Sequence, residues 1–328
     1  MNWECVVCAL SRSSHDAGRF IAQDRHPALK ILRKVHQNLR TKKLLKSLIP
    51  PVVLPGLQAA RNKLRYLLTG VSHTNEYLPK GWDSLMGTKA ALGWNVGQVV
   101  EHNKRMWIKF QTIWEGTGPM VPHGEHLKTI DGLIDHNRMM IFAYSLTLAL
   151  AGSSSLSILD WGGGLGQSYF VAKALLPDNV EIDYHCKEIR DLVECGRELM
   201  PNQHFYDDES CFQRTYDMVM ANASLYYSRC WEALLEGLAT ATSKYLLITR
   251  QPFVLNVPSF LCLERLYRFG YQVEVPAWVL NKDCFLREAE KHDLKLVREF
   301  VTGQTYEIDK APEQPLFLAF LFKSGSLS

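Results

Sequence analysis

One acidic residue and a run of alternating glycines form the most chemically informative stretch of this chain. Asp160 ends a short apolar run, and Gly162, Gly164 and Gly166 then recur at every second position, with Gly163 after the first of them. A glycine lets the backbone adopt conformations that a Cβ would forbid and lets a ligand approach it closely. The spacing therefore predicts a turn that binds a ligand, and a tight turn without a ligand is the alternative.

The glycine turn lies between a predicted strand and a predicted helix. Residues 156–159 are an apolar run of the kind found in buried strands, and residues 169–176 have a helical pattern that Pro177 ends. Such a strand, turn and helix form the first unit of a doubly wound α/β sheet, which binds ligands at the carboxyl ends of its strands. A dinucleotide turn would have its third glycine at position 167, where Gln167 stands, so a dinucleotide is disfavoured.

Strands and helices alternate along the rest of the chain. The patterns predict strands at residues 180–187, 204–208, 216–222, 244–249, 294–300 and 316–322, and a short extended segment at 271–275. They predict helices at residues 99–113, 131–150, 190–200, 231–241 and 281–292. This alternation indicates an α/β sheet with helices on both faces, preceded by an N-terminal helical segment.

Charge divides the chain of 328 residues into two parts. The first 70 residues hold 13 Lys and Arg against 3 Asp and Glu, whereas the remainder holds 24 against 31. We therefore predict three regions: a basic arm at residues 1–70 that is partly disordered or amphipathic and helical, a helical cap at 71–152, and the sheet domain at 153–324.

Composition and charge also limit which partners and which cellular compartment we predict. The amphipathic basic segment at residues 27–68 predicts either peripheral contact with an anionic membrane or packing on the domain with a solvated face. Nucleic acid is not predicted, because the arm lacks interleaved aromatic residues and a binding motif. No apolar run reaches the length of a membrane span and no signal-peptide core is present, which predicts a cytoplasmic protein, or one at the inner face of the membrane. Cys5 and Cys8 have metal-type spacing without a second pair, so no metal site is predicted.

The stretch from Asp160 to Gly166 resembles motif I of the class I S-adenosylmethionine-dependent methyltransferases. Residues 75–323 also resemble a bacterial group of methyltransferases that is often associated with surface-polysaccharide gene clusters. The matching stretches are residues 93–95, 159–166, 188–196, 221–227 and 249–253. The resemblance implies a Rossmann-like doubly wound sheet of about seven strands with an antiparallel last strand, and S-adenosyl-L-methionine as cofactor. It implies O-methylation of a sugar or another small polar acceptor, a glycan precursor, in surface-glycan biosynthesis.

The resemblance also implies which residues contact the cofactor. In the family the glycine backbone passes under the methionine and ribose parts, and an acid after the third strand often faces the adenine. Glu188 ends the second predicted strand, where a carboxylate can accept from both ribose hydroxyls, and Asp183 is the alternative. The acids after the third predicted strand are Asp207 and Asp208, and either can instead be an ordinary loop residue. The predicted cofactor-binding residues are Asp160, Gly162, Gly163, Gly164, Gly166, Glu188, Asp207, Asp208, Asn222 and Ala223.

The sequence leaves the catalytic residue open. Transfer to a hydroxyl benefits from a general base, and the candidates are His123, His126, Asp131, His136 and Tyr226. Tyr226 has the better place, after the fourth strand, but it is a poor base at its ordinary pKa. Two other functions compete with methyl transfer: a nicotinamide-dependent oxidoreductase on a similar sheet, and a non-catalytic homologue that binds the cofactor.

Overall fold

The computed structural model describes residues 75–85, 93–94, 97–115, 130–267, 273–303 and 306–326. The chain divides into two units, Met1–Val71 and Ser72–Ser328, and every described residue belongs to the second. The predicted basic arm and its membrane contact therefore lie outside the described residues, as do His123 and His126. Among the helices that the structure describes, none is long and apolar enough to cross a membrane.

A mostly parallel sheet forms the centre of the described part of the chain. Its parallel strands lie in the order β6-β5-β2-β3-β4, and β11 pairs antiparallel with both β6 and β9. This confirms the predicted Rossmann-like sheet with an antiparallel last strand, which is the arrangement of the class I methyltransferase fold. The bounds are β2 (Ser155–Trp161), β3 (Glu181–Lys187), β4 (His204–Tyr206), β5 (Tyr216–Asn222), β6 (Thr242–Val254), β9 (Leu294–Val301) and β11 (Leu316–Ser324).

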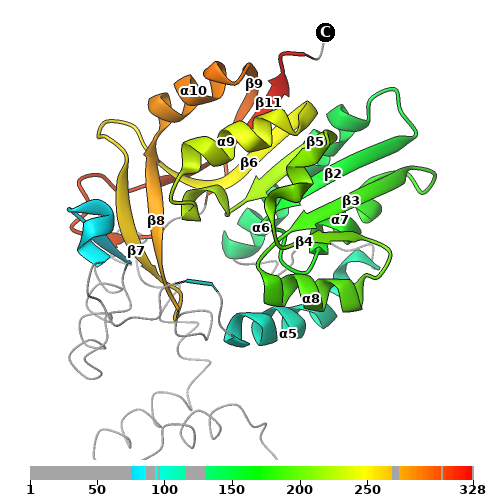
Figure 1. Ribbon diagram of the computed structural model, residues 1–328, viewed down its shortest axis with the longest axis horizontal. Coiled ribbons are helices and arrows are strands. Elements are labelled where there is room, and N and C mark those ends of the chain that lie inside the picture. The colour runs from blue at the N-terminus through cyan, green and yellow to red at the C-terminus, as the bar shows by residue number, and fades with distance from the viewer. Residues whose placement is uncertain are drawn as a thin grey trace, which may run out of the picture. The chain divides into compact units, whose positions relative to one another are not determined.

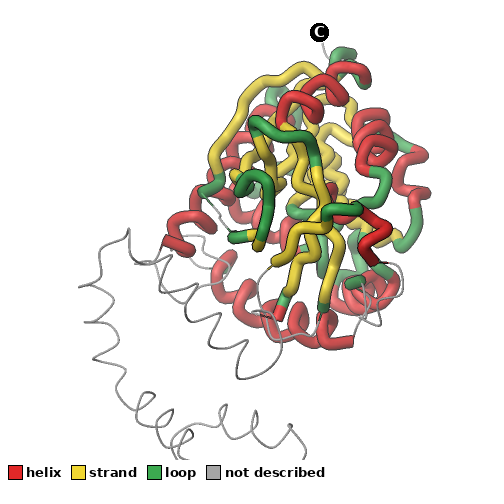
Figure 2. The backbone as a smooth tube through the Cα atoms, turned by 90° about the vertical axis from the view of Figure 1, so that its left-hand side faces the viewer, coloured by secondary structure: helices red, strands yellow, loops and turns green. Residues whose placement is uncertain are grey.

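Helices cover both faces of this sheet (Figures 1 and 2). Successive strand residues point to opposite faces of the sheet. Ile158 therefore packs in a core with the four helices between residues 97 and 199, and Leu159 packs in a core with the two helices between residues 231 and 291. Because both faces are covered at the centre of the sheet, β5 and β6 are buried over most of their lengths, without the alternation of a half-exposed strand. The helices are α5 (Gly97–Trp114), α6 (Ile130–Leu150), α7 (Gln167–Leu175), α8 (Arg190–Leu199), α9 (Trp231–Thr240) and α10 (Lys282–Lys291).

A second group of strands, which the sequence analysis did not predict as such, extends the sheet beyond β6. It consists of β1 (Asn75–Leu78), β7 (Phe260–Arg265), β8 (Glu274–Asn281) and β10 (Ile308–Asp309). The order β10-β1-β7-β8 joins the central sheet where β8 pairs with Phe253 and Val254 at the end of β6. The region predicted as a helical cap therefore contains a strand. Of the extended segment predicted at 271–275, Glu274 and Val275 begin β8. Tyr77 pairs with Cys262, far along the chain, so a local pattern does not reveal this pairing.

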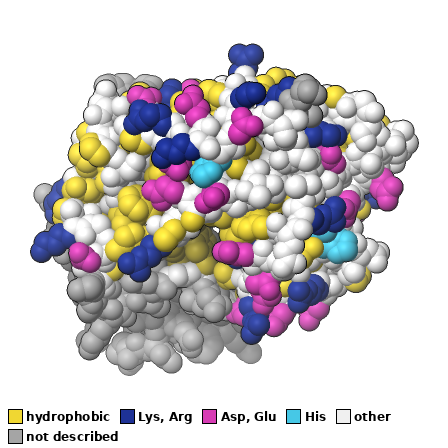
Figure 3. Space-filling view, turned by 45° about the horizontal axis from the view of Figure 1, so that its top comes forward, with side chains coloured by type: hydrophobic (Ala, Val, Ile, Leu, Met, Phe, Trp, Pro, Cys, Tyr) yellow, Lys and Arg dark blue, Asp and Glu magenta, His cyan; other side chains and the backbone are white. Residues whose placement is uncertain are grey.

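Three short 3-10 helices complete the described elements: η2 (Gly81–Leu85), η3 (Glu209–Gln213) and η4 (Leu225–Tyr227). The face drawn in Figure 3 carries basic and acidic side chains interspersed among one another over the described residues.

Candidate functional site

A cavity of about 240 Å³ lies at the carboxyl ends of β2, β5 and β6. Residues of α5, α6 and α7 form its other walls, among them His102, Arg138 and Ser168. The chain crosses from β2 to β3 on one side and returns to β5 on the other, so this is the point at which the strand order reverses. Open α/β sheets bind ligands at such a point. A cavity of about 30 Å³ adjoins it and extends to Thr249.

The glycine turn forms one wall of the larger cavity. Gly162, Gly163 and Gly164 line it, and Gly166 precedes α7 as its N-terminal cap residue. A Cβ on Gly162 would lie 2.4 Å from the Cβ of Ser224, and one on Gly163 would lie 2.7 Å from the Cγ of Asp160. These two glycines are therefore required by packing within the chain itself, in addition to any ligand.

Asp160 places a buried carboxylate at the wall of the cavity. Its side chain is fully buried, and the hydroxyl of Tyr184 donates to Oδ2 at 2.7 Å. Oδ1 is buried without a hydrogen-bond partner among the residues that the structure describes. Burial raises the pKa of Asp160, against the opposing hydrogen bonds from Tyr184 and Ser168. A buried, unpartnered carboxylate oxygen is costly, so this atom favours a ligand that carries a donor or a positive charge.

Glu188 holds the glycine turn from the end of the neighbouring strand β3. Its Oε2 accepts from the backbone N–H of Gly164 at 3.0 Å, and Oε1 accepts from that of Ile189 at 2.8 Å. Burial raises the pKa of Glu188, and the two backbone hydrogen bonds oppose this rise. The carboxylate does not line the 240 Å³ cavity itself. Each of its oxygens has a further lone pair for a ligand hydroxyl.

The predicted acids after β4 make local contacts. The Nε of Arg190 donates to Oδ2 of Asp207 at 2.9 Å, and Asp208 accepts from the backbone N–H of Ser210 at 3.0 Å, which caps η3. Neither acid lines the cavity, and a contact with adenine stays a prediction for both.

Of the two residues predicted at the end of β5, Asn222 lines the cavity and Ala223 does not. The Oδ1 of Asn222 is buried without a partner among the described residues. Ala223 has a φ of +55° and donates its N–H to the carbonyl of Thr249 at 2.9 Å, which ties the end of β5 to β6. The structure therefore brings Asp160, the glycine turn and Asn222 together, as the sequence analysis expected.

Two of the base candidates, His136 and Tyr226, do not line the cavity. Asp131 and His136 both belong to α6. Tyr226 is buried, and its hydroxyl donates to that of Tyr227 at 3.0 Å, which donates to Glu264 at 2.6 Å. Burial raises the pKa of Tyr226, and the charge of Glu264 adds to the rise. A neutral, enclosed tyrosine is a weak base.

Three of the cavity residues that the sequence analysis did not identify have basic side chains: His102, Arg138 and Arg250. The first two lie on α5 and α6, where a helical pattern marks the apolar face but says nothing about which polar residue meets the sheet. Arg250 directly follows the predicted strand at 244–249, and its place at a strand end was the available signal.

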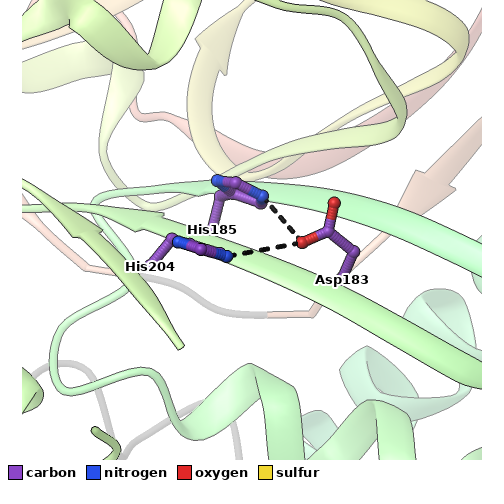
Figure 4. Close-up of side chains that lie close together, drawn as sticks. All are labelled: Asp183, His185 and His204. Atoms are coloured by element: carbon purple, nitrogen blue, oxygen red, sulfur yellow. Dashed lines mark hydrogen bonds and ion pairs between the residues drawn. The ribbon is translucent and has the colours of Figure 1, made fainter. Parts of the chain in front are cut away.

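A second polar cluster lies on β3 and β4 (Figure 4). The Nε2 atoms of His185 and His204 lie 2.9 Å and 3.8 Å from Oδ1 of Asp183, a spacing that could hold a metal ion. Arg214, however, donates to Oδ2 of Asp183 at 2.8 Å and lies 3.1 Å from Nε2 of His185. A guanidinium against the same ligand atoms repels a cation, so we interpret the cluster as an ion-pair network. Asp183, the alternative to Glu188, is thus engaged away from the glycine turn.

No family model matches the chain, and no curated protein matches it. Among solved structures, it is similar to a magnesium protoporphyrin IX methyltransferase from Synechocystis with bound S-adenosylmethionine (14% identity, 72% of this chain, 100% of that chain, TM-score 0.42). It is also similar to an S-adenosylmethionine-dependent methyltransferase from Clostridium acetobutylicum (10% identity, 67% and 99% covered, TM-score 0.40). A third is an O-methyltransferase from a Brevibacillus brevis multienzyme with S-adenosylhomocysteine (13% identity, 58% and 76% covered, TM-score 0.39).

The strand order defines a chain of the Rossmann-like methyltransferase fold. The similarities to solved structures are remote, so what the cavity binds has to be argued from the residues of this chain.

Proposed function

We propose that this chain is an S-adenosylmethionine-dependent methyltransferase with its cofactor in the cavity at the ends of β2, β5 and β6. The observation that carries the proposal is the Asp160 carboxylate, which is fully buried at the cavity wall with Oδ1 unpartnered among the described residues. S-adenosylmethionine has an ammonium and a sulfonium charge and no phosphate. A nicotinamide dinucleotide would instead bring its pyrophosphate against a buried negative group at the same turn.

The residues around the turn fit the remaining parts of such a cofactor. Glu188 is fixed by two backbone N–H groups and keeps lone pairs that can accept from a ribose diol. The Oδ1 of Asn222 offers a second buried acceptor at the cavity. Apolar side chains at the cavity wall help to exclude water; they are Met106, Phe110, Met139 and Val171.

The bound cofactor would supply a methyl group on positively charged sulfur, open to in-line displacement by an acceptor atom. The contribution of the protein is to orient the reactants and to accept a proton when the acceptor is a hydroxyl. His102 is the imidazole that lines the cavity, which makes it the base candidate of this proposal. The acceptor that we propose is a sugar or another small polar molecule of surface-glycan biosynthesis, and this part rests on the sequence resemblance.

Calorimetric titration with S-adenosylmethionine, S-adenosylhomocysteine and NAD tests the cofactor assignment. We expect the first two ligands to bind and NAD to give no heat. Binding of NAD alone would favour the oxidoreductase, and binding of none of the three would overturn the proposal. If the two adenosyl compounds bind but no acceptor is ever methylated, the non-catalytic alternative is correct.

A glycine variant locates the site. Gly164 lines the cavity and has a φ of +62°, so Gly164→Val should abolish the binding of S-adenosylhomocysteine by filling the cavity. Gly152→Val is the matched control, because Gly152 has a φ of +78° with nothing within 4 Å of an added Cβ. The control carries the same backbone strain, and it should bind like the wild type.

A further inference from the structure

A bulge in β6 turns Arg250 toward the cavity. Ile248 pairs with Phe320 and Gln251 pairs with Leu318, so Thr249 and Arg250 together face the single residue Ala319 of β11. Such a bulge re-aims the side chain at a strand end. Arg250 also has a φ of +56°, a conformation that non-glycine residues rarely adopt and that gathers at functional sites. The outcome is that Arg250 lines the 240 Å³ cavity.

A second guanidinium lies at the same cavity. Arg138 of α6 lines both cavities and forms an ion pair with Asp135, one helical turn earlier. The two side chains are 10% and 7% exposed. Burial, together with the charge of Arg250, lowers the pKa of Arg138 to about 9, so it stays protonated at neutral pH. Asp135 forms the ion pair with Arg138, and Arg250 brings a second guanidinium to the same cavity.

The hydroxyl of Thr249 is a second indication of a ligand, independent of the charges of Arg138 and Arg250. It is 7% exposed, it lines the smaller cavity beside Arg138, and its Oγ1 has no hydrogen-bond partner among the described residues. A buried hydroxyl with no partner is costly, and it can donate to an oxygen of a ligand. Two guanidiniums and a hydroxyl are the donor set that a carboxylate or phosphate prefers.

We propose that Arg138, Arg250 and Thr249 form an anion subsite that holds a carboxylate or phosphate group of the methyl acceptor. The assignment rests on the proposed function, and it narrows the acceptor to anionic molecules, such as a sugar that carries a phosphate or a carboxylate.

Strand order separates this subsite from Glu188, the carboxylate that we assign to the ribose of the cofactor. Glu188 follows β3 and Arg250 lies in β6, and the order β3-β2-β5-β6 puts two strands between them. Neighbouring strands lie about 4.8 Å apart, so the two ends of the site are on the order of 14 Å apart along the sheet edge. The residues assigned to the cofactor lie at the ends of β3, β2 and β5, which leaves the β6 end of the cavity for the acceptor.

Inorganic pyrophosphate is the probe that tests the subsite. It is titrated into the full chain at low ionic strength, with and without saturating S-adenosylhomocysteine. We expect pyrophosphate to bind the wild type in both cases, and to bind Arg250→Gln about tenfold more weakly or worse. Arg298→Gln is the matched control, because Arg298 is an exposed arginine of β9 that does not line the cavity. It loses the same charge and should bind like the wild type.

Arg138→Lys is the companion variant, because it keeps the charge beside Asp135 and loses the guanidinium fork. It should also weaken pyrophosphate binding, although less than Arg250→Gln does. Thermal unfolding of each variant reports that the protein has folded. Binding of S-adenosylhomocysteine should match the wild type within about twofold, well inside 1 kcal/mol.

Three results would overturn the assignment to the acceptor. The first is no pyrophosphate binding by the wild type, and the second is equal binding by the wild type and Arg250→Gln. The third is loss of S-adenosylhomocysteine binding in Arg250→Gln while 5′-methylthioadenosine, which lacks the amino-acid part, still binds; Arg250 would then hold the carboxylate of the cofactor. If the wild type binds pyrophosphate through Arg250 but no adenosyl compound, the anion subsite stands and the proposed function is wrong.

Discussion

The backbone N–H of Gly164 donates to Oε2 of Glu188 at 3.0 Å, which joins the glycine turn after β2 to the end of β3. The other carboxylate oxygen accepts from the N–H of Ile189 at 2.8 Å. One side chain therefore satisfies two backbone donors at neighbouring strand ends, and it fixes the turn that walls the cavity. Glu188, which the sequence analysis assigned to the ribose diol, therefore also stabilises the glycine turn.

Glu188→Gln should weaken the binding of S-adenosylhomocysteine about tenfold, since a carboxamide has a single acceptor oxygen for two backbone N–H groups. Calorimetric titration measures the affinity. Glu181→Gln is the control, because Glu181 is exposed at the other end of the same strand. Equal affinity of Glu188→Gln and the wild type would contradict the cofactor role of this carboxylate.

Asp160→Asn should separate stability from binding. The buried charge of Asp160 is unfavourable in the ligand-free protein, as its raised pKa indicates, so the free energy of unfolding should not fall in the variant. The affinity for S-adenosylmethionine should fall, because a neutral amide attracts an ammonium less strongly. Thermal unfolding and calorimetry measure the two quantities.

Tyr184→Phe is the companion to this variant. It removes the hydroxyl that donates to Oδ2 of the buried Asp160 carboxylate, so we expect a loss of about 1 to 3 kcal/mol in stability. For Asp160→Asn, a fall in stability together with the fall in affinity for S-adenosylmethionine would show that Asp160 has a structural role only.

Gly163→Ala should destabilise the protein by about 1 to 3 kcal/mol through overpacking. The added Cβ would lie 2.7 Å from Cγ of Asp160 and 2.8 Å from Sγ of Cys186. Gly97→Ala is the control, since Gly97 begins α5 with nothing within 4 Å of an added Cβ. Denaturant unfolding of both variants measures the difference, and two equal stabilities would refute the packing argument.

The protein should become less stable as the pH falls, because His185 titrates at a lower pH in the folded protein than in the unfolded chain. Burial lowers the pKa of His185 from 6.5 to about 4, against the opposing effect of Asp183. Between these values the unfolded chain binds a proton that the folded protein does not, so this contribution is complete above pH 6.5 and is lost as the pH falls to about 4. The loss amounts to at most about 3 kcal/mol.

Denaturant unfolding from pH 4 to 7 measures this dependence. His185→Gln should flatten this dependence, because the group with the lowered pKa is then absent. A slope that His185→Gln leaves unchanged would assign the acid sensitivity to other groups.

Local pattern was sufficient for the central sheet. The apolar run before Asp160, the alternating glycines and the helix ended by Pro177 predicted β2, the turn and α7, because each feature depends on residues close in sequence. The same holds for β3, α8, β5, α9 and α10, whose predicted bounds differ from the observed bounds by two residues or fewer. Asp160 and Asn222 reached the cavity as predicted, because a strand end in a parallel sheet determines where the next side chain goes.

Long-range pairing decided the remainder. The predicted strand at 244–249 continues as β6 to Val254, because β11 and β8 supply partners for residues that follow a bulge. That bulge, and the docking of α6 on the strand ends, bring Arg138 and Arg250 to one cavity although they lie far apart in sequence. The sequence by itself determined the sheet, the glycine turn and the acid beside it. Only the tertiary structure decided which polar side chains line the cavity, because burial and strand register arise from contacts that no local pattern contains.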